Sequence, residues 1–164
     1  MRNVKQTALI AAFGFFSANA LAADKAATVS MEQISSKSAF TLAQETVNQC
    51  EASGYKVSAT VVDLSGYVIA QLRSDGAGTH TLDSSRQKAF TSASMKQPTA
   101  NLMKLIAEKP IMQPLQNMND NLLFLAGGLP IEINGKVVGA IGVGGAPGGH
   151  LDVACAESAM KKVL

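Results

Sequence analysis

The sequence predicts a mixed α/β (α+β) fold in which helices pack against a five-stranded, mostly antiparallel sheet, in the order α-β-β-α-α-β-β-β-α. Three observations support it: short apolar runs rich in β-branched residues, tight turns between neighbouring runs, and longer stretches with apolar residues at helical spacing. The clearest turn is Asn134-Gly135, which suits the two positive φ angles of a type I′ hairpin. Because tight turns join antiparallel strands, most of the sheet is expected to be antiparallel.

The first helix is predicted from a capping box. Ser30 can cap the helix and Gln33 can reach back to it, so we expect a helix from 30 to about 53. Gly54 suits the position after its C-terminus.

The remaining elements follow from the same signals, with prolines and glycines marking their ends. In order, we expect strands at 57–63 and 67–73, a helix from Asp83 or Ser84 to about Lys96, a short helix at 99–107, an irregular stretch at 109–121, a strand at 122–126, the two strands of the 127–145 hairpin, and a closing helix at 150–164.

Glycines recur along the outgoing strand of the hairpin, at positions 139, 142, 144 and 145. Each removes a side chain where another backbone or a flat ligand must come close. This organisation favours a binding fold.

The N-terminal residues have the pattern of a secretory signal peptide. Arg2 and Lys5 precede the apolar stretch 7–16, and Ala20-Leu21-Ala22 is a small-x-small cleavage site. We therefore expect residues 1–22 to be removed and 23–164 to form a single domain in the periplasm or outside the cell; the alternative is a retained N-terminal anchor. Without Arg2 and Lys5 the formal charge falls from +2 to 0, which argues against nucleic acid or anionic lipid as a partner. No other long apolar run suggests a membrane span.

Cys50 and Cys155 both fall in predicted helices, at opposite ends of the chain. In an oxidising compartment an even number of cysteines favours a bridge, and this one would close a loop of about a hundred residues. The alternative is two separately buried small apolar side chains.

Three segments together resemble one known family. They are 61–66 (VVDLSG) running into 73–77 (RSDGA), 84–91 (SSRQKAFT) with 97–99 (QPT), and 127–130 (GGLP) through 142–145 (GVGG), closing with 152–156 (DVACA). In this order and spacing the chain resembles the GlcG/HbpS family, which includes extracellular haem-binding proteins and the C-terminal domain of PduO. The resemblance covers nearly all of the chain from about Ser30. It implies a profilin-like fold, homo-oligomers from dimers up to octamers, and, for some members, binding of haem or iron.

The iron ligand is sought first among His80 and His150, because imidazole is the expected axial ligand of haem. Position favours His80, in a glycine-rich loop just before a helix; the alternative for both is an exposed loop histidine. Some family members use threonine instead, and Thr91 and Thr99 are the threonines in the matching helical segments.

Basic side chains are candidates to pair with the propionates of haem or with another carboxylate. They are Arg73, Arg86, Lys88 and Lys96. For Arg86 the alternative is a local ion pair with Asp83, three residues earlier. The glycine-rich loop at 144–149 can present N–H groups to an anion, or its glycines can simply allow tight strand-to-helix closure.

Several functions have no support in the sequence. There is no Cys-x-x-Cys-His for covalent haem, no Walker sequence for nucleotides and no visible catalytic constellation. The leading hypothesis is an exported haem-binding protein in which an apolar face of the sheet and the second helix hold the porphyrin. The rivals are an oligomeric accessory protein of an oxidoreductase system, associating through its glycine-rich hairpin, and a binder of small carboxylates.

Overall fold

The computed structural model of the chain describes residues 27–164. The chain divides into two units, Met1–Met31 and Glu32–Leu164, and the second contains every helix and strand named below. The expected signal peptide, residues 1–22, lies outside the described residues. Among the residues that the structure covers, no helix combines the length and apolar character needed to cross a membrane.

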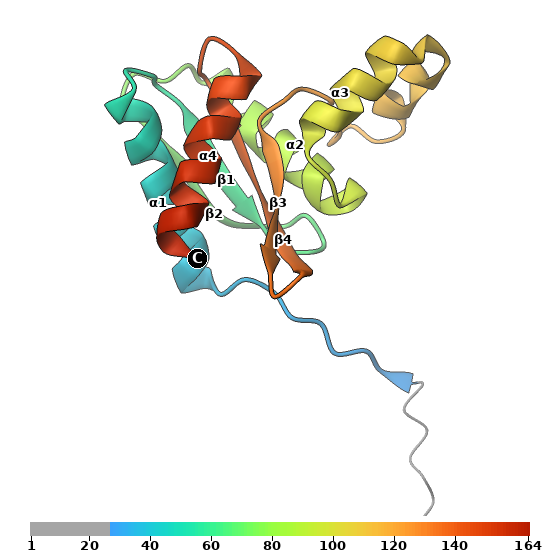
Figure 1. The fold of residues 1–164 in the computed structure, drawn as a ribbon, viewed down its shortest axis with the longest axis horizontal. Helices are drawn as coiled ribbons and strands as arrows, with labels where there is room; N and C mark the ends of the chain where they lie inside the picture. Colours follow the sequence, from blue (N-terminus) through green and yellow to red (C-terminus); the bar gives the residue numbers. More distant parts are fainter. Residues whose placement is uncertain (1–26) are drawn as a thin grey trace, which may run out of the picture. The chain divides into compact units, whose positions relative to one another are not determined.

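The sheet has four antiparallel strands in the order β2-β1-β4-β3 (Figure 1). Their bounds are Ser58–Val62 for β1, Val68–Arg73 for β2, Gly128–Ile133 for β3 and Lys136–Gly144 for β4. The predicted hairpin is confirmed: β3 pairs with β4, and Asn134 and Gly135 have φ angles of 52° and 74°. The α/β class is therefore confirmed with one strand fewer than expected.

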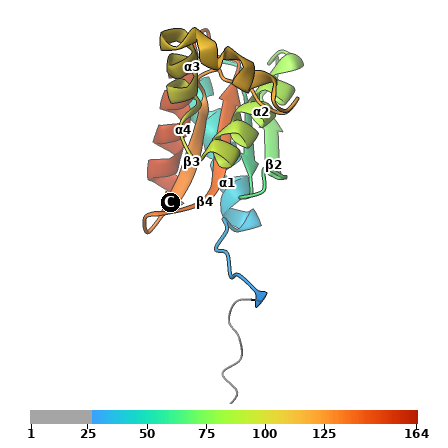
Figure 2. The ribbon, with the colours of Figure 1, turned by 90° about the vertical axis from the view of Figure 1, so that its right-hand side faces the viewer.

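Helices cover both faces of the sheet (Figures 1 and 2). On one face α1 (Ser36–Ala52) and α4 (Gly149–Val163) lie side by side, and α2 (His80–Met95) lies on the other. After α2 the chain forms α3 (Thr99–Glu108), where a short helix was expected. A 3-10 helix, η2 (Pro110–Asn117), then lies in the stretch expected to be irregular.

Strand alternation gives the two faces different cores. Ala59 and Val61 of β1 point into the larger core beneath α1 and α4. Their neighbours Ser58 and Thr60 face α2, where they hydrogen-bond to Thr81 and Ser85 at 2.8 Å each. The α2 face is thus built from short hydroxyl and methyl side chains, which hold the helix close to the strands.

The glycines of β4 make room for the chain's own backbone. A Cβ at Gly142 would lie only 2.1 Å from the carbonyl oxygen of Ser85, and one at Gly139 would lie 2.5 Å from that of Val62. Of the two expected reasons for these glycines, close backbone approach is the one observed. The layer between the sheet and α2 is already filled, so a porphyrin held by these two elements would have to lie outside that layer.

Cys50 and Cys155 form a disulfide that joins α1 to α4, with their Cα atoms 5.3 Å apart. The bridge spans a sequence separation of 105 residues. Closing a loop of this length stabilises the fold by about 4–5 kcal/mol in the chain-entropy model. The bridge that the sequence favoured is confirmed, and the alternative of two separately buried cysteines is wrong.

Two helix starts differ from the prediction. The first helix begins at Ser36 with Ser35 as its cap, because the backbone N–H of Ile34 donates to Val138 and keeps the preceding residues out of the helix. Ser35 Oγ accepts from the N–H of Ser38 in place of the capping box expected at Ser30. The second helix begins at His80, earlier than Asp83 or Ser84, where the Thr81 hydroxyl fastens its first turn to β1.

The strand predicted at 122–126 is absent. The N–H of Leu123 donates to Thr91 Oγ1 of α2 at 2.8 Å, and the N–H of Leu122 donates to the carbonyl of Asn119. Because these amides are used by α2 and by a turn, the segment follows the helix and does not extend the sheet beyond β3.

Candidate functional site

A pocket opens at the N-terminal end of α4, and we call it the α4 pocket. Its volume is about 580 Å³, within the range of about 300–1,000 Å³ usual for small-molecule sites. Five segments supply its lining: α2, α3, the chain at 125–126, the glycine-rich loop and the first turn of α4. The lining residues are His80, Lys88, Ala100, Met103, Leu125, Ala126, Gly145, Ala146, Pro147, Gly148, Gly149, His150, Asp152 and Val153.

A buried ion pair joins the elements around this pocket. Lys88 Nζ of α2 lies 2.9 Å from Asp152 Oδ2 of α4, and it also donates to the carbonyl oxygen of Val143 at 2.8 Å. Asp152 Oδ1 accepts from the N–H of Ala146 at 3.1 Å. Lys88 is 6% exposed and Asp152 is 2% exposed. The pair therefore fixes α2, the end of β4, the loop and α4 relative to one another.

Burial raises the pKa of the Asp152 carboxyl, because a charged carboxylate loses its hydration there. The attraction of Lys88, its hydrogen bond and the Ala146 amide act in the opposite direction and offset only part of that shift. Lys88 therefore favours the charged form of Asp152, against the effect of burial.

Both histidines of the chain line the α4 pocket, from two different helices. His80 is the first residue of α2 and His150 the second residue of α4, and both side chains are exposed. Each imidazole lies over the glycine two residues earlier: a Cβ at Gly78 or Gly148 would meet the ring of its histidine at 2.6 or 2.7 Å. These glycines give the rings room to fold back beside their loops.

The other predicted ligands lie outside this pocket. Arg86 donates from Nε and Nη2 to Asp83 and from Nη1 to Asn121, so the alternative of a local ion pair is observed. Thr91 and Thr99 are fully buried. Thr91 Oγ1 donates to the carbonyl of Gln87 and accepts from Leu123, while Thr99 Oγ1 accepts from the N–H of Gly128.

The remaining basic candidates, Arg73 and Lys96, are exposed and do not line the α4 pocket. Of the predicted cofactor-binding residues, the fold brings together Lys88 and the two histidines. Within residues 27–164, no group of three or more histidine, cysteine, aspartate or glutamate side chains could hold a bare metal ion.

The glycine-rich loop shows the tight closure expected as one of its two uses. A Cβ at Gly145 would lie 2.4 Å from the carbonyl oxygen of Lys56, and one at Gly149 would lie 2.5 Å from that of Ala126. The loop also forms one side of the pocket, so closure and access to a ligand are not exclusive.

Sequence reasoning missed the role of Asp152 and the place of Leu125 in the pocket lining; of Met95, Met103 and Met112, which the sequence also suggested for an apolar pocket, Met103 lines this one. Asp152 stands 64 positions after Lys88, and no local signal connects the two. Met103 and Leu125 line the pocket with 43% and 50% of their surface exposed. Such exposure of large apolar side chains beside a cavity is a signal that only the fold provides.

Comparison with known proteins places the chain among haem-related proteins. A family model described as haem degrading protein HbpS-like matches residues 34–161. The crystal structure of a double mutant of HbpS from Streptomyces reticuli is 34% identical, with a TM-score of 0.77; the match covers 98% of this chain and 99% of that one.

Two further relatives are more distant or shorter in overlap. A crystal structure of a PduOC:heme complex is 21% identical, with a TM-score of 0.69 over 79% of this chain and 94% of that one, and shows a similar fold. An uncharacterized 15.0 kDa protein of Citrobacter freundii, from the dhaT-dhaS intergenic region, is 34% identical over 87 residues. That match covers 52% of this chain and 61% of the relative, so it spans about three-fifths of the relative's length.

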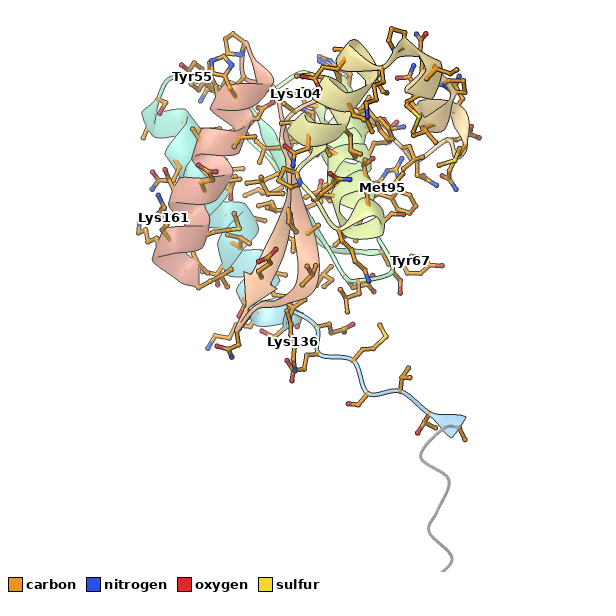
Figure 3. All side chains as sticks on the ribbon, turned by 45° about the vertical axis from the view of Figure 1, so that its right-hand side comes forward. Tyr55, Tyr67, Met95, Lys104, Lys136 and Lys161 are labelled. Carbon is orange, nitrogen blue, oxygen red and sulfur yellow. A yellow bond between two sulfur atoms is a disulfide. The ribbon has the colours of Figure 1, made fainter. Side chains whose placement is uncertain are left out.

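Replacing Lys88 by methionine is expected to lower the free energy of unfolding by about 3–5 kcal/mol, because Asp152 loses its buried partner and must either stay charged without it or take up a proton. The double variant Lys88→Met/Asp152→Leu should recover much of the loss. Chemical denaturation of each purified variant measures the change. Lys161→Met, at the exposed far end of α4 (Figure 3), should change stability by less than about 0.5 kcal/mol. A Lys88→Met variant as stable as this control would contradict the importance of the pair.

Proposed function

The chain belongs to the HbpS-like family, whose model matches residues 34–161, and from this we propose that it binds haem in the α4 pocket. The family description names haem, and a protein of similar fold has been solved as a haem complex. The described side chains support the binding of haem, and the proposal is confined to that binding.

The observation that carries the proposal is the meeting of both histidines at one pocket. Imidazole nitrogen is a common axial ligand of haem iron. The two rings come from the first turns of α2 and α4 and are exposed, so either can turn toward a ligand without disturbing the core. His80 is our first choice for the axial ligand, with His150 as the second.

The apolar part of the pocket lining suits a flat apolar ring system. Ala100 and Met103 of α3 and Leu125 of the following segment line this part of the pocket. An apolar wall with a few polar groups is the usual construction of a cofactor site. A porphyrin would bury the exposed parts of Met103 and Leu125.

The two threonines are poorly placed to act as iron ligands. The hydroxyls of Thr91 and Thr99 are buried and already hydrogen-bonded to backbone groups. Coordination by either would leave a backbone N–H without its acceptor, which costs free energy. We therefore place histidine ahead of threonine as the iron ligand.

Export of the protein is the second part of the proposal. The signal-peptide pattern at 1–22 supports it. The disulfide between Cys50 and Cys155 agrees with it, because such bridges persist in oxidising compartments and are rare in the cytosol. The site of action would be the periplasm or the medium.

Self-association is the third part. Large apolar side chains of η2 and of the turn that follows stay exposed in the single chain, among them Ile111 and Met118. No side chain of η2 is buried. A patch of this kind is typical of a protein–protein interface, and we propose a homo-oligomer, from dimer up to octamer.

Titration of the purified mature protein with haemin is expected to give a shifted Soret band at micromolar protein, with one haem per chain. His80→Ala should weaken binding by about tenfold or more, or about 1.4 kcal/mol, and move the band, whereas His150→Ala, which removes the other imidazole of the pocket, serves as the matched comparison. A Soret band that stays that of free haemin would contradict the proposal, and so would unchanged binding in the variant lacking both histidines.

Native mass spectrometry of the protein recovered from the periplasm or the medium tests export and assembly together. The expected subunit begins near Ala23, is two hydrogens lighter than its reduced form, and occurs as an oligomer. Subunits that keep residues 1–22, carry free thiols, or remain single chains at micromolar concentration would each contradict the corresponding part.

A further inference from the structure

Lys88 has one hydrogen-bond donor more than its internal partners use. Its ammonium group carries three N–H donors. Among the described residues it donates to the Val143 carbonyl at 2.8 Å and to Asp152 Oδ2 at 2.9 Å. The side chain is more than nine-tenths buried, yet it forms part of the pocket lining. A third donor therefore remains for a group that enters the pocket.

The backbone around Lys88 is shaped to admit its ammonium group. A Cβ at Gly127 would lie 2.8 Å from Lys88 Nζ and 2.5 Å from the Val143 carbonyl oxygen. A Cβ at Gly144 would lie 3.7 Å from the same nitrogen. Two glycines thus hold open the space at the floor of the pocket where Nζ lies.

Polar groups of the residues that line the pocket favour a negative ligand atom. In the part of the chain that the structure describes, the backbone N–H groups of Gly149 and His150 donate to no backbone or side-chain acceptor. They begin α4, a helix of fifteen residues, whose N-terminus carries partial positive charge. The charged and titratable side chains that line the pocket are Lys88, Asp152, His80 and His150, and of these Asp152 alone is acidic.

We infer that Lys88 anchors a carboxylate of the ligand at the floor of the α4 pocket and shares its ammonium group between that carboxylate and Asp152. The ligand class is an apolar molecule that carries a carboxylate. This inference rests on the proposed function, in which the carboxylate is a propionate of haem. Asp152 is then the internal competitor: it holds Lys88 in place and limits how strongly Lys88 attracts the ligand.

This arrangement assigns opposite effects to the two members of the ion pair. Removing the Lys88 ammonium removes the anchor, so a ligand with free carboxylates loses its advantage over one without them. Replacing Asp152 by asparagine keeps the shape and one acceptor oxygen but removes the negative charge. Lys88 then attracts the ligand carboxylate more strongly, since the negative charge that competed for its ammonium group and repelled the ligand carboxylate is gone.

The test compares haemin with haemin dimethyl ester, in which both propionates are esterified, in the same detergent solution. Soret titrations give the ratio of the two dissociation constants for each protein. The wild type should prefer haemin by about tenfold. Lys88→Met should bring the ratio close to one, and Asp152→Asn should raise it several-fold above the wild type. Lys161→Met, which removes a positive charge at the far end of α4, should leave the ratio unchanged.

Each outcome decides the inference. A wild type that binds both forms equally overturns the inference and leaves the haem site standing, whereas no Soret change with either form overturns the proposed function together with the inference. A preference that survives in Lys88→Met also overturns the inference. If Lys88→Met does not fold, Asp152→Asn decides alone, and a ratio that does not rise in that variant overturns the inference.

Discussion

The buried contact between Lys88 and Asp152 is the interaction on which the site depends. It joins α2 to α4 across the end of β4, with the Val143 carbonyl and the Ala146 amide as further partners. Buried ion pairs are weak evidence for stability, because desolvation offsets most of their attraction. Their value here is positional: the pair sets the floor of the pocket and fixes the first turn of α4, from which His150 projects.

Close backbone packing determines where a ligand can and cannot enter. Gly142 lets α2 approach the sheet until the Ser85 carbonyl would touch any added Cβ, and paired hydroxyls fill the rest of that layer. A flat ligand therefore has no room between the sheet and α2. At the end of the same strand, Gly144 and Gly145 let the chain turn toward α4 beside the pocket, where Met103 and Leu125 leave apolar surface uncovered.

Sequence reasoning succeeded where the signal is local and failed where a distant partner decides. Asn134-Gly135 carries its own turn geometry, so the hairpin was predictable, as was the pairing of Arg86 with Asp83. The segment 122–126 has the composition of a strand, but a hydroxyl of α2, Thr91, takes its amide. The site divides in the same way: His80, Lys88 and His150 were identified by residue type, whereas the role of Asp152 became visible only once α4 lay against α2.

The central claim is that haem iron binds in the α4 pocket, bounded by α3 and α4. Anomalous diffraction at the iron absorption edge, from crystals grown with haemin, locates that iron directly. The account predicts one iron peak per chain inside the α4 pocket, within about 2–2.5 Å of an imidazole nitrogen of His80 or His150. An iron peak in the layer between the sheet and α2, or on a surface that touches neither histidine, would contradict it.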